Sequence, residues 1–153
     1  MRTRKKNNLI LLVIISICFL LVLVGFINYL FSPSYKSKKV VEAFYTYEQK
    51  GYFSDSWELL HPHMKDRWSK SQFMTDRYHV FIGHFGTETF QFTIKESDKI
   101  KGWRMAEGLK PFDVTYKFTV MQTYKGKYGK FSFIQEVYVA KDKDDWKILW
   151  DYN

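Results

Sequence analysis

The histidines are the side chains of this sequence with the greatest capacity for metal or acid–base chemistry. All four lie between positions 61 and 84, and His61-Pro62-His63 offers two imidazoles at alternating spacing. A zinc site needs further cysteine, histidine or carboxylate ligands at regular spacing, and none accompanies this pair. The sequence therefore predicts no metal and no cofactor, and it favours exposed or capping histidines in this stretch.

Two glutamines, and no carboxylates, are the polar residues on the apolar faces of two alternating segments, so these faces offer no general base. In the alternating segment from Phe112 to Tyr124, Gln122 is the clearly polar residue on the apolar face, and Gln135 has the same position in the following segment. Successive residues of a strand point to opposite faces, so the strand carboxylates fall on the other side, at Asp113, Glu136 and Asp151. A buried carboxylate with a shifted pKa is therefore not expected on the sheet, and no catalytic residue is predicted.

The candidate residues for lining an interior pocket are His84, Tyr116, Gln122 and Gln135. His84 is included because it continues a helical stripe, at i, i+4, i+7 and i+11, that contains Phe73, Arg77 and Val80. Tyr116 shares the apolar strand face with Gln122. The two glutamines could orient a ligand, or they could pair with each other or with the backbone.

The elements that position these residues come in the order helices first, strands afterwards. An apolar helical stripe from Val40 to Tyr47 predicts a first helix, and shorter helices follow, interrupted at Pro62 and restarting near Ser69. From Thr89 onward the hydrophobic period changes from helical to alternating. This order predicts an α+β domain in which about three helices pack on a mainly antiparallel sheet.

The outer face of that sheet is not fully polar. Four apolar residues fall on it, and they are candidates for an interface: Met121, Ile134, Tyr138 and Leu149. Exposed apolar patches often mark contact sites, so the pattern predicts a protein partner or a homodimer. The alternative is that Trp103 and the irregular segment 96–111 fold over this face.

An uncharged apolar run extends from Leu9 to Phe31 and follows a basic tail at residues 1–8. As a helix its 23 residues measure about 34 Å, enough to cross a hydrocarbon core of about 30 Å. The basic tail predicts a cytoplasmic N-terminus and an extracytoplasmic domain at residues 32–153. A cleaved signal peptide is the alternative, but the run is long for one and Ser32-Pro33-Ser34 is a poor cleavage site. We therefore predict an uncleaved anchor in the lipid bilayer.

The charge and the cysteine content narrow the function classes. The formal net charge is +8, and the tail carries half of it. The modest remaining excess favours nearby anionic lipid or wall polymer and does not support a nucleic-acid partner. Cys18 is the only cysteine and lies in the apolar run, so the domain has no disulfide, as is typical of a bacterial envelope domain.

Three stretches carry a family resemblance: Val40-Val41-Glu42-Ala43-Phe44-Tyr45, Tyr124-Lys125-Gly126-Lys127-Tyr128-Gly129 and Trp146-Lys147-Ile148-Leu149-Trp150-Asp151. Over roughly residues 34–153 the chain resembles the nuclear transport factor 2-like superfamily. More narrowly, it resembles the non-catalytic N-terminal domain of methicillin-resistance-type penicillin-binding proteins. The resemblance implies a cone of helices against a curved sheet. The Ser-x-x-Lys and Lys-Thr-Gly motifs of the catalytic domain do not occur here, so no transpeptidase activity is implied.

Together these features predict a binding or scaffold domain of the bacterial cell envelope, held on the plasma membrane by its own anchor. The alternative is a small-molecule-binding or enzymatic cone pocket of the isomerase or dehydratase type.

Overall fold

The computed structural model describes residues 2–84, 86–87 and 89–153, and the side chains from residue 12 onward except those at 81, 82, 96 and 97. The chain forms two compact units, Met1–Tyr35 and Lys36–Asn153.

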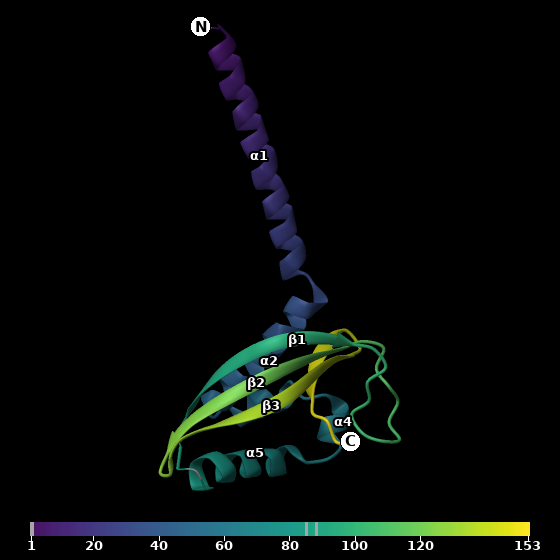
Figure 1. Ribbon diagram of the computed structural model, residues 1–153. Coiled ribbons are helices and arrows are strands. Elements are labelled where there is room, and N and C mark those ends of the chain that lie inside the picture. The colour runs from purple at the N-terminus through teal and green to yellow at the C-terminus, as the bar shows by residue number, and fades with distance from the viewer. Residues whose placement is uncertain (1, 85, 88) are drawn as a thin grey trace. The chain divides into compact units, whose positions relative to one another are not determined.

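The first unit contains α1 (Arg2–Leu30), a single uninterrupted helix (Figure 1). It is longer than the apolar run because the helix continues back into the basic tail. Its segment Leu12–Leu30 is long and apolar enough to cross a membrane, and none of it is buried within the protein. The prediction of an N-terminal apolar helix is confirmed, and the helix is consistent with either a single-pass anchor or a signal sequence.

The first helix of the domain, α2 (Pro33–Gln49), starts at two clear signals. The Ser32 hydroxyl accepts a hydrogen bond from the Tyr35 backbone N–H at 3.2 Å, and Pro33 takes the first helical position. Gly51, with a φ of 72°, follows its end. The buried positions towards its C-terminal half are Val41, Phe44, Tyr45 and Glu48, which form one helical stripe.

Three short helices follow, namely α3 (Phe53–Glu58), α4 (Pro62–Lys65) and α5 (Lys70–Tyr78), and a π-helical segment, η1 (His79–His84), continues α5. Pro62 separates α3 from α4, as the sequence predicts, because proline favours the first turn of a new helix. The hydroxyl of Ser69 and the side chain of Gln72 form a reciprocal capping box at the start of α5.

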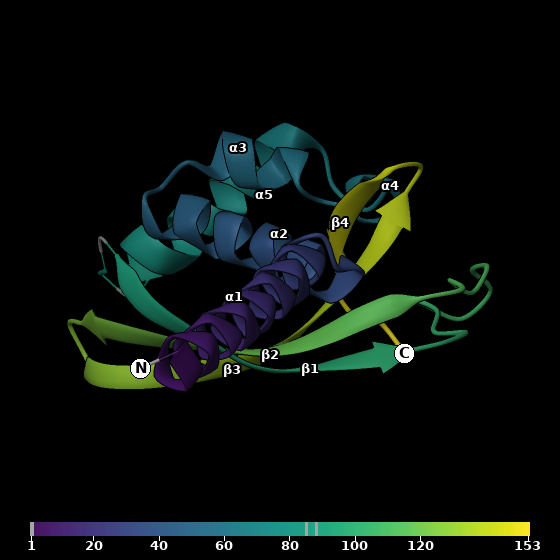
Figure 2. The same cartoon turned by 90° about the horizontal axis from the view of Figure 1, so that it is seen from above.

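The sheet consists of β1 (Phe90–Ile100), β2 (Thr115–Gly126), β3 (Gly129–Asp142) and β4 (Asp145–Leu149), hydrogen-bonded in that order and all antiparallel. A bulge interrupts the pairing of β1 between Lys95 and Ser97. Leu60 adds a parallel bridge to Ile148. Helices α2, α3 and α5 all lie on one side of β1, β2 and β3 (Figure 2). The predicted α+β order of helices on a mainly antiparallel sheet is confirmed.

The core lies between this helical layer and the inner face of the sheet. Alternate residues of β2, from Tyr116 to Tyr124, are buried there, as the alternation predicts. Large, completely buried side chains come from both layers, among them Phe44, Tyr45, Leu60, Met64, Phe118, Tyr124 and Ile148. Each large apolar side chain buried in this way contributes about 1.5–3 kcal/mol, so α2 is held chiefly by its packing against the sheet.

The segment between β1 and β2 covers part of the outer sheet face. Trp103 and Phe112 form an isolated antiparallel bridge within it, and the backbone N–H of Tyr152 donates to the carbonyl of Met105 at 2.8 Å. The side chain of Met105 is only 1% exposed. The irregular segment is therefore an ordered cover.

Candidate functional site

A carboxylate lies in the interior of the domain, and it comes from a helix. Glu48 of α2 is 4% exposed, and its two oxygens have separate partners. Oε1 accepts from the Ser56 hydroxyl at 2.5 Å, and Oε2 accepts from Nε of Arg77 at 2.5 Å. A buried carboxylate is costly unless it is paired and hydrogen-bonded, and this arrangement meets both conditions.

Two tyrosine–glutamine pairs extend this polar interior across the sheet. The Tyr45 hydroxyl donates to Oε1 of Gln135 at 2.9 Å, and the Tyr124 hydroxyl donates to Oε1 of Gln122 at 2.7 Å. Burial raises the pKa of both tyrosine hydroxyls, so each remains a protonated donor at neutral pH. The glutamines predicted to face the interior do face it, and both have tyrosine partners instead of the alternatives weighed from the sequence.

The four predicted pocket residues do not converge on one cavity. Gln122 and Gln135 are neighbours on adjacent strands, whereas Tyr116 lies six positions along β2 from Gln122, about 20 Å away at strand spacing. Tyr116 is buried against the ring of Trp146, with centroids 5.4 Å apart. His84 is exposed at the end of η1.

A cavity of about 190 Å³ is lined by the other residues of the helical stripe that was predicted to include His84. Phe73, Arg77 and Val80 line it together with Trp68, Asp76 and Trp150. His84 is not among its lining residues. The change from α-helical to π-helical winding at His79 takes position 84 out of phase with the residues before it. We call this space the aromatic cavity.

The charge of Arg77 is engaged at the wall of the aromatic cavity. Its guanidinium carbon lies 5.6 Å from the ring centroids of both Phe73 and Trp150, while its Nε holds Glu48. These contacts combine cation–π attraction with an ion pair. The cavity is therefore lined by indole rings and by one exposed carboxylate, Asp76. The neighbouring guanidinium of Arg77 is already paired with Glu48.

A second, larger space of about 480 Å³ lies where β1 begins beside the β2–β3 hairpin. We call it the hairpin groove. It is lined by Gln49, Thr89, Phe90, Gln91, Thr123, Tyr124, Lys125 and Lys130. Its floor is apolar and its rim carries amides, hydroxyls and two ammonium groups.

The histidines near α4 have structural contacts. Nδ1 of His61 accepts from the His63 backbone N–H at 3.1 Å and thereby caps α4, and the two imidazole centroids are 4.8 Å apart. Burial, with a smaller effect from His63, lowers the pKa of His61 to about 4, so its ring is neutral at physiological pH. Within the described residues, no three histidine, cysteine or acidic side chains gather closely enough to hold a metal.

The predicted interface residues separate into two groups. Tyr138 is 4% exposed beneath Trp103, and Leu149 is completely buried. Tyr138 therefore lies under the chain's own covering segment, and neither residue is on a free surface. Ile134 is 72% exposed and Met121 is half-buried, so this part of the outer face remains accessible.

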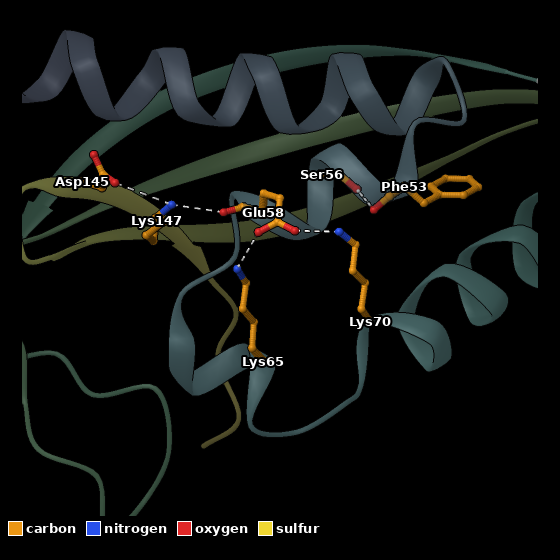
Figure 3. Close-up of polar contacts among 7 residues, drawn as sticks. All are labelled: Phe53, Ser56, Glu58, Lys65, Lys70, Asp145 and Lys147. Carbon is orange, nitrogen blue, oxygen red and sulfur yellow. Dashed lines mark hydrogen bonds and ion pairs between the residues drawn. The ribbon is translucent and has the colours of Figure 1, made fainter.

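The basic residues of the short helices are matched by partners in the same unit. Glu58 accepts from Nζ of Lys70 at 2.6 Å and of Lys65 at 3.4 Å, and Nζ of Lys147 donates to its backbone carbonyl at 3.1 Å (Figure 3). The hydrogen bond from Lys70, supported by Lys65, holds the pKa of the Glu58 carboxyl below its usual range. Arg67 lies over the ring of Tyr152 at 3.8 Å. This cluster links α3 to α4, α5 and β4.

Glu48 is a buried carboxylate that the alternation of the strands could not predict, because it lies on a helix. Its signal was present in the sequence, because Val41, Phe44, Tyr45 and Glu48 repeat at i, i+3, i+4 and i+7. Glu136, in contrast, lies on the outer face as predicted and pairs with Lys117 at 2.5 Å. Comparison of the chain with family models and with curated proteins finds no match.

Proposed function

We propose that this protein is a binding or scaffold module of the bacterial cell envelope, held on the plasma membrane by α1. In this proposal the N-terminus is cytoplasmic and residues 32–153 form an extracytoplasmic domain of the nuclear transport factor 2-like type. The apolar, exposed segment Leu12–Leu30 and the basic residues before it support the anchor and its direction.

One observation carries the choice of binding over catalysis. The interior polar groups that a cone-pocket enzyme would use are joined to one another: Glu48 to Arg77 and Ser56, and the two tyrosines to the two glutamines. A general base must be free to take a proton from a substrate, and Glu48 has both oxygens occupied. The accessible features are on the surface instead, at Ile134 and in the hairpin groove.

Topology can be tested with single cysteines, because the native Cys18 lies in the apolar segment. Tyr128→Cys, at a residue 76% exposed in the β2–β3 turn, should react with a membrane-impermeant maleimide in intact cells. Thr3→Cys in the basic tail should react only after permeabilisation. The labelled protein should keep the mass of the whole chain. The reverse labelling pattern, or a mass lacking the first residues, would overturn the anchored topology.

The binding role can be tested at Ile134 with a photo-crosslinking amino acid in the intact protein. We expect a discrete adduct, either a second copy or another envelope protein, and no such adduct from the same probe at Lys101. Equal, diffuse crosslinking from both positions would contradict a specific surface at Ile134.

The aromatic cavity supports a second candidate, a small-molecule-binding or enzymatic domain of the isomerase or dehydratase type. Its two indoles, Trp68 and Trp150, lie 6.0 Å apart beside Asp76, which fits a small ligand with an apolar body and a hydrogen-bond donor. A ligand held there should quench tryptophan fluorescence in the wild-type protein and lose affinity in Trp68→Ala. A fragment screen without any saturable quenching would exclude this candidate.

A further inference from the structure

The hairpin groove contains two lysines that lie directly opposite each other on adjacent strands. Lys125 of β2 and Lys130 of β3 are directly opposite in register, so their side chains leave the same face of the hairpin. Like charges in directly opposite positions destabilise a strand pair. Within the described part of the chain neither ammonium group has an ion-pair partner, and both side chains are exposed.

Several basic residues elsewhere in the domain are paired with carboxylates. Lys65, Lys70 and Arg77 each contact a carboxylate, and Lys117 pairs with Glu136. Between Asp113 and Glu136 the sequence contains no acidic residue. The end of the hairpin is therefore a region of positive potential that the domain itself leaves uncompensated.

The rest of the groove offers hydrogen bonds in line with the two lysines. Gln91 of β1 is paired with Thr123, whose hydroxyl contacts that of Ser132 at 2.9 Å. The Gln91 side chain is exposed and makes no hydrogen bond to another described residue. The pairing of β1 with β2 starts at Phe90 and Tyr124, so Lys125 and Gly126 extend beyond the edge strand. This leaves a strip of amide, hydroxyl and ammonium groups along one sheet edge.

Such a strip suits a chain that alternates charged and hydroxylated groups. An ammonium group binds phosphate as a point charge, while amides and hydroxyls bind polyol oxygens. A volume of about 480 Å³ is much larger than one phosphate needs, and the groove is open to a longer ligand. No exposed aromatic ring lines it to stack a nucleobase, since Phe90 and Tyr124 are buried.

We propose that the hairpin groove binds a polyol-phosphate polymer, with phosphodiester oxyanions between Lys125 and Lys130 and polyol hydroxyls at Gln91 and Thr123. This inference rests on the proposed envelope location and names the class of partner. The groove includes Gln49 at the C-terminal end of α2.

The test uses the intact chain in neutral phosphatidylcholine nanodiscs and a fluorescent synthetic poly(glycerol phosphate). We expect saturable binding that weakens at least about tenfold in Lys125→Gln/Lys130→Gln. The matched control, Lys101→Gln/Lys110→Gln, removes the same charge from exposed loop lysines and should retain the affinity. Equal losses in both variants, or no loss in either, would overturn the assignment to the groove.

Competition separates the sources of phosphate. Free poly(glycerol phosphate) should displace the probe, whereas phosphatidylglycerol vesicles and a single-stranded DNA of equal charge should displace it poorly. Equal displacement by vesicles would assign the groove to lipid headgroups, and equal displacement by DNA to any polyanion; either result overturns the proposal. The groove variant should unfold at or above the wild-type temperature, because it relieves a like-charge pair, so lost binding cannot be attributed to misfolding. If no polymer binds while Tyr128→Cys is still labelled from outside, this inference fails and the anchored topology stands.

Discussion

The indole of Trp103 lies flat on the phenol ring of Tyr138, with ring centroids 4.2 Å apart and planes inclined by only 4°. This contact fastens the segment between β1 and β2 to the outer face of β3. It also removes Tyr138 from the surface at which partners could dock.

Trp103→Ala should therefore release the cover. Loss of a half-buried aromatic contact should lower the free energy of unfolding by about 2 kcal/mol. Tyr138 should become accessible, which hydrogen exchange of the segment around Trp103 and the sedimentation behaviour of the protein would report. Trp103→Phe keeps a stacking ring and serves as the control. An unchanged unfolding midpoint in Trp103→Ala would show that the cover does not depend on this contact.

The ion pair between Glu48 and Arg77 should be costly to break from one side only. Arg77→Met leaves Glu48 buried with Ser56 as its remaining partner, and we expect a loss of about 3 kcal/mol in denaturant unfolding. Glu48→Leu combined with Arg77→Met should recover part of that loss, because the Ser56 hydroxyl still contacts the Phe53 carbonyl at 3.1 Å. Strict additivity of the two substitutions would mean that the pair is not coupled.

The domain should lose stability in mild acid through His61. Its folded pKa of about 4 lies below the usual 6.5, so the unfolded chain binds more protons between these values. Stability from this residue is complete above about pH 6.5 and falls with pH until about pH 4, by roughly 3 kcal/mol in total. Protonation would also remove the acceptor that caps α4.

The measurement is the unfolding free energy of the intact protein as a function of pH. His61→Asn keeps a capping side chain that does not titrate, so it should flatten the curve between pH 4 and 6.5. His84→Asn, at an exposed histidine, should leave the curve as in wild type. Identical curves for His61→Asn and wild type would exclude His61 as the source.

The start of α5 offers a smaller, local test. The Ser69 hydroxyl accepts from the Gln72 backbone N–H at 3.2 Å, so Ser69→Ala should cost about 1 kcal/mol. Ser71→Ala, in the same turn but without a capping contact, should stay within about 0.5 kcal/mol of wild type. Thermal unfolding followed by circular dichroism can compare the two, and equal effects would argue against the cap.

Local signals account for what the sequence could predict. The apolar run, the helix start near Ser69 and the alternation through β2 each depend on residues close in the chain, and all appear in the structure. Gln122 and Gln135 were placed on the inner face by the same alternation. Their tyrosine partners were not predicted, because Tyr45 and Gln135 are 90 positions apart.

Non-local contacts account for what was missed. The helical stripe includes Glu48, but its partner Arg77 lies 29 positions later, so the ion pair could not be predicted from local sequence. The covering segment around Trp103 has no hydrophobic periodicity. The sequence therefore allows its path over Tyr138 as one alternative but does not favour it over an accessible outer face. His84 was placed by an α-helical period that η1 does not keep.

The pairing of Leu60 with Ile148 has a consequence for how the domain is made. The backbone at Leu59 and His61 bonds to Ile148 on both sides, at 2.8 and 2.9 Å, so the middle of the helical layer is fastened by the last strand. A chain that emerges N-terminus first cannot form these hydrogen bonds until Ile148 is available. If the domain crosses the membrane as proposed, its helices remain incompletely packed on the far side until β4 has crossed. A chain stalled before β4 would then expose its incompletely covered core to envelope proteases, so the domain cannot finish folding until β4 has crossed the membrane.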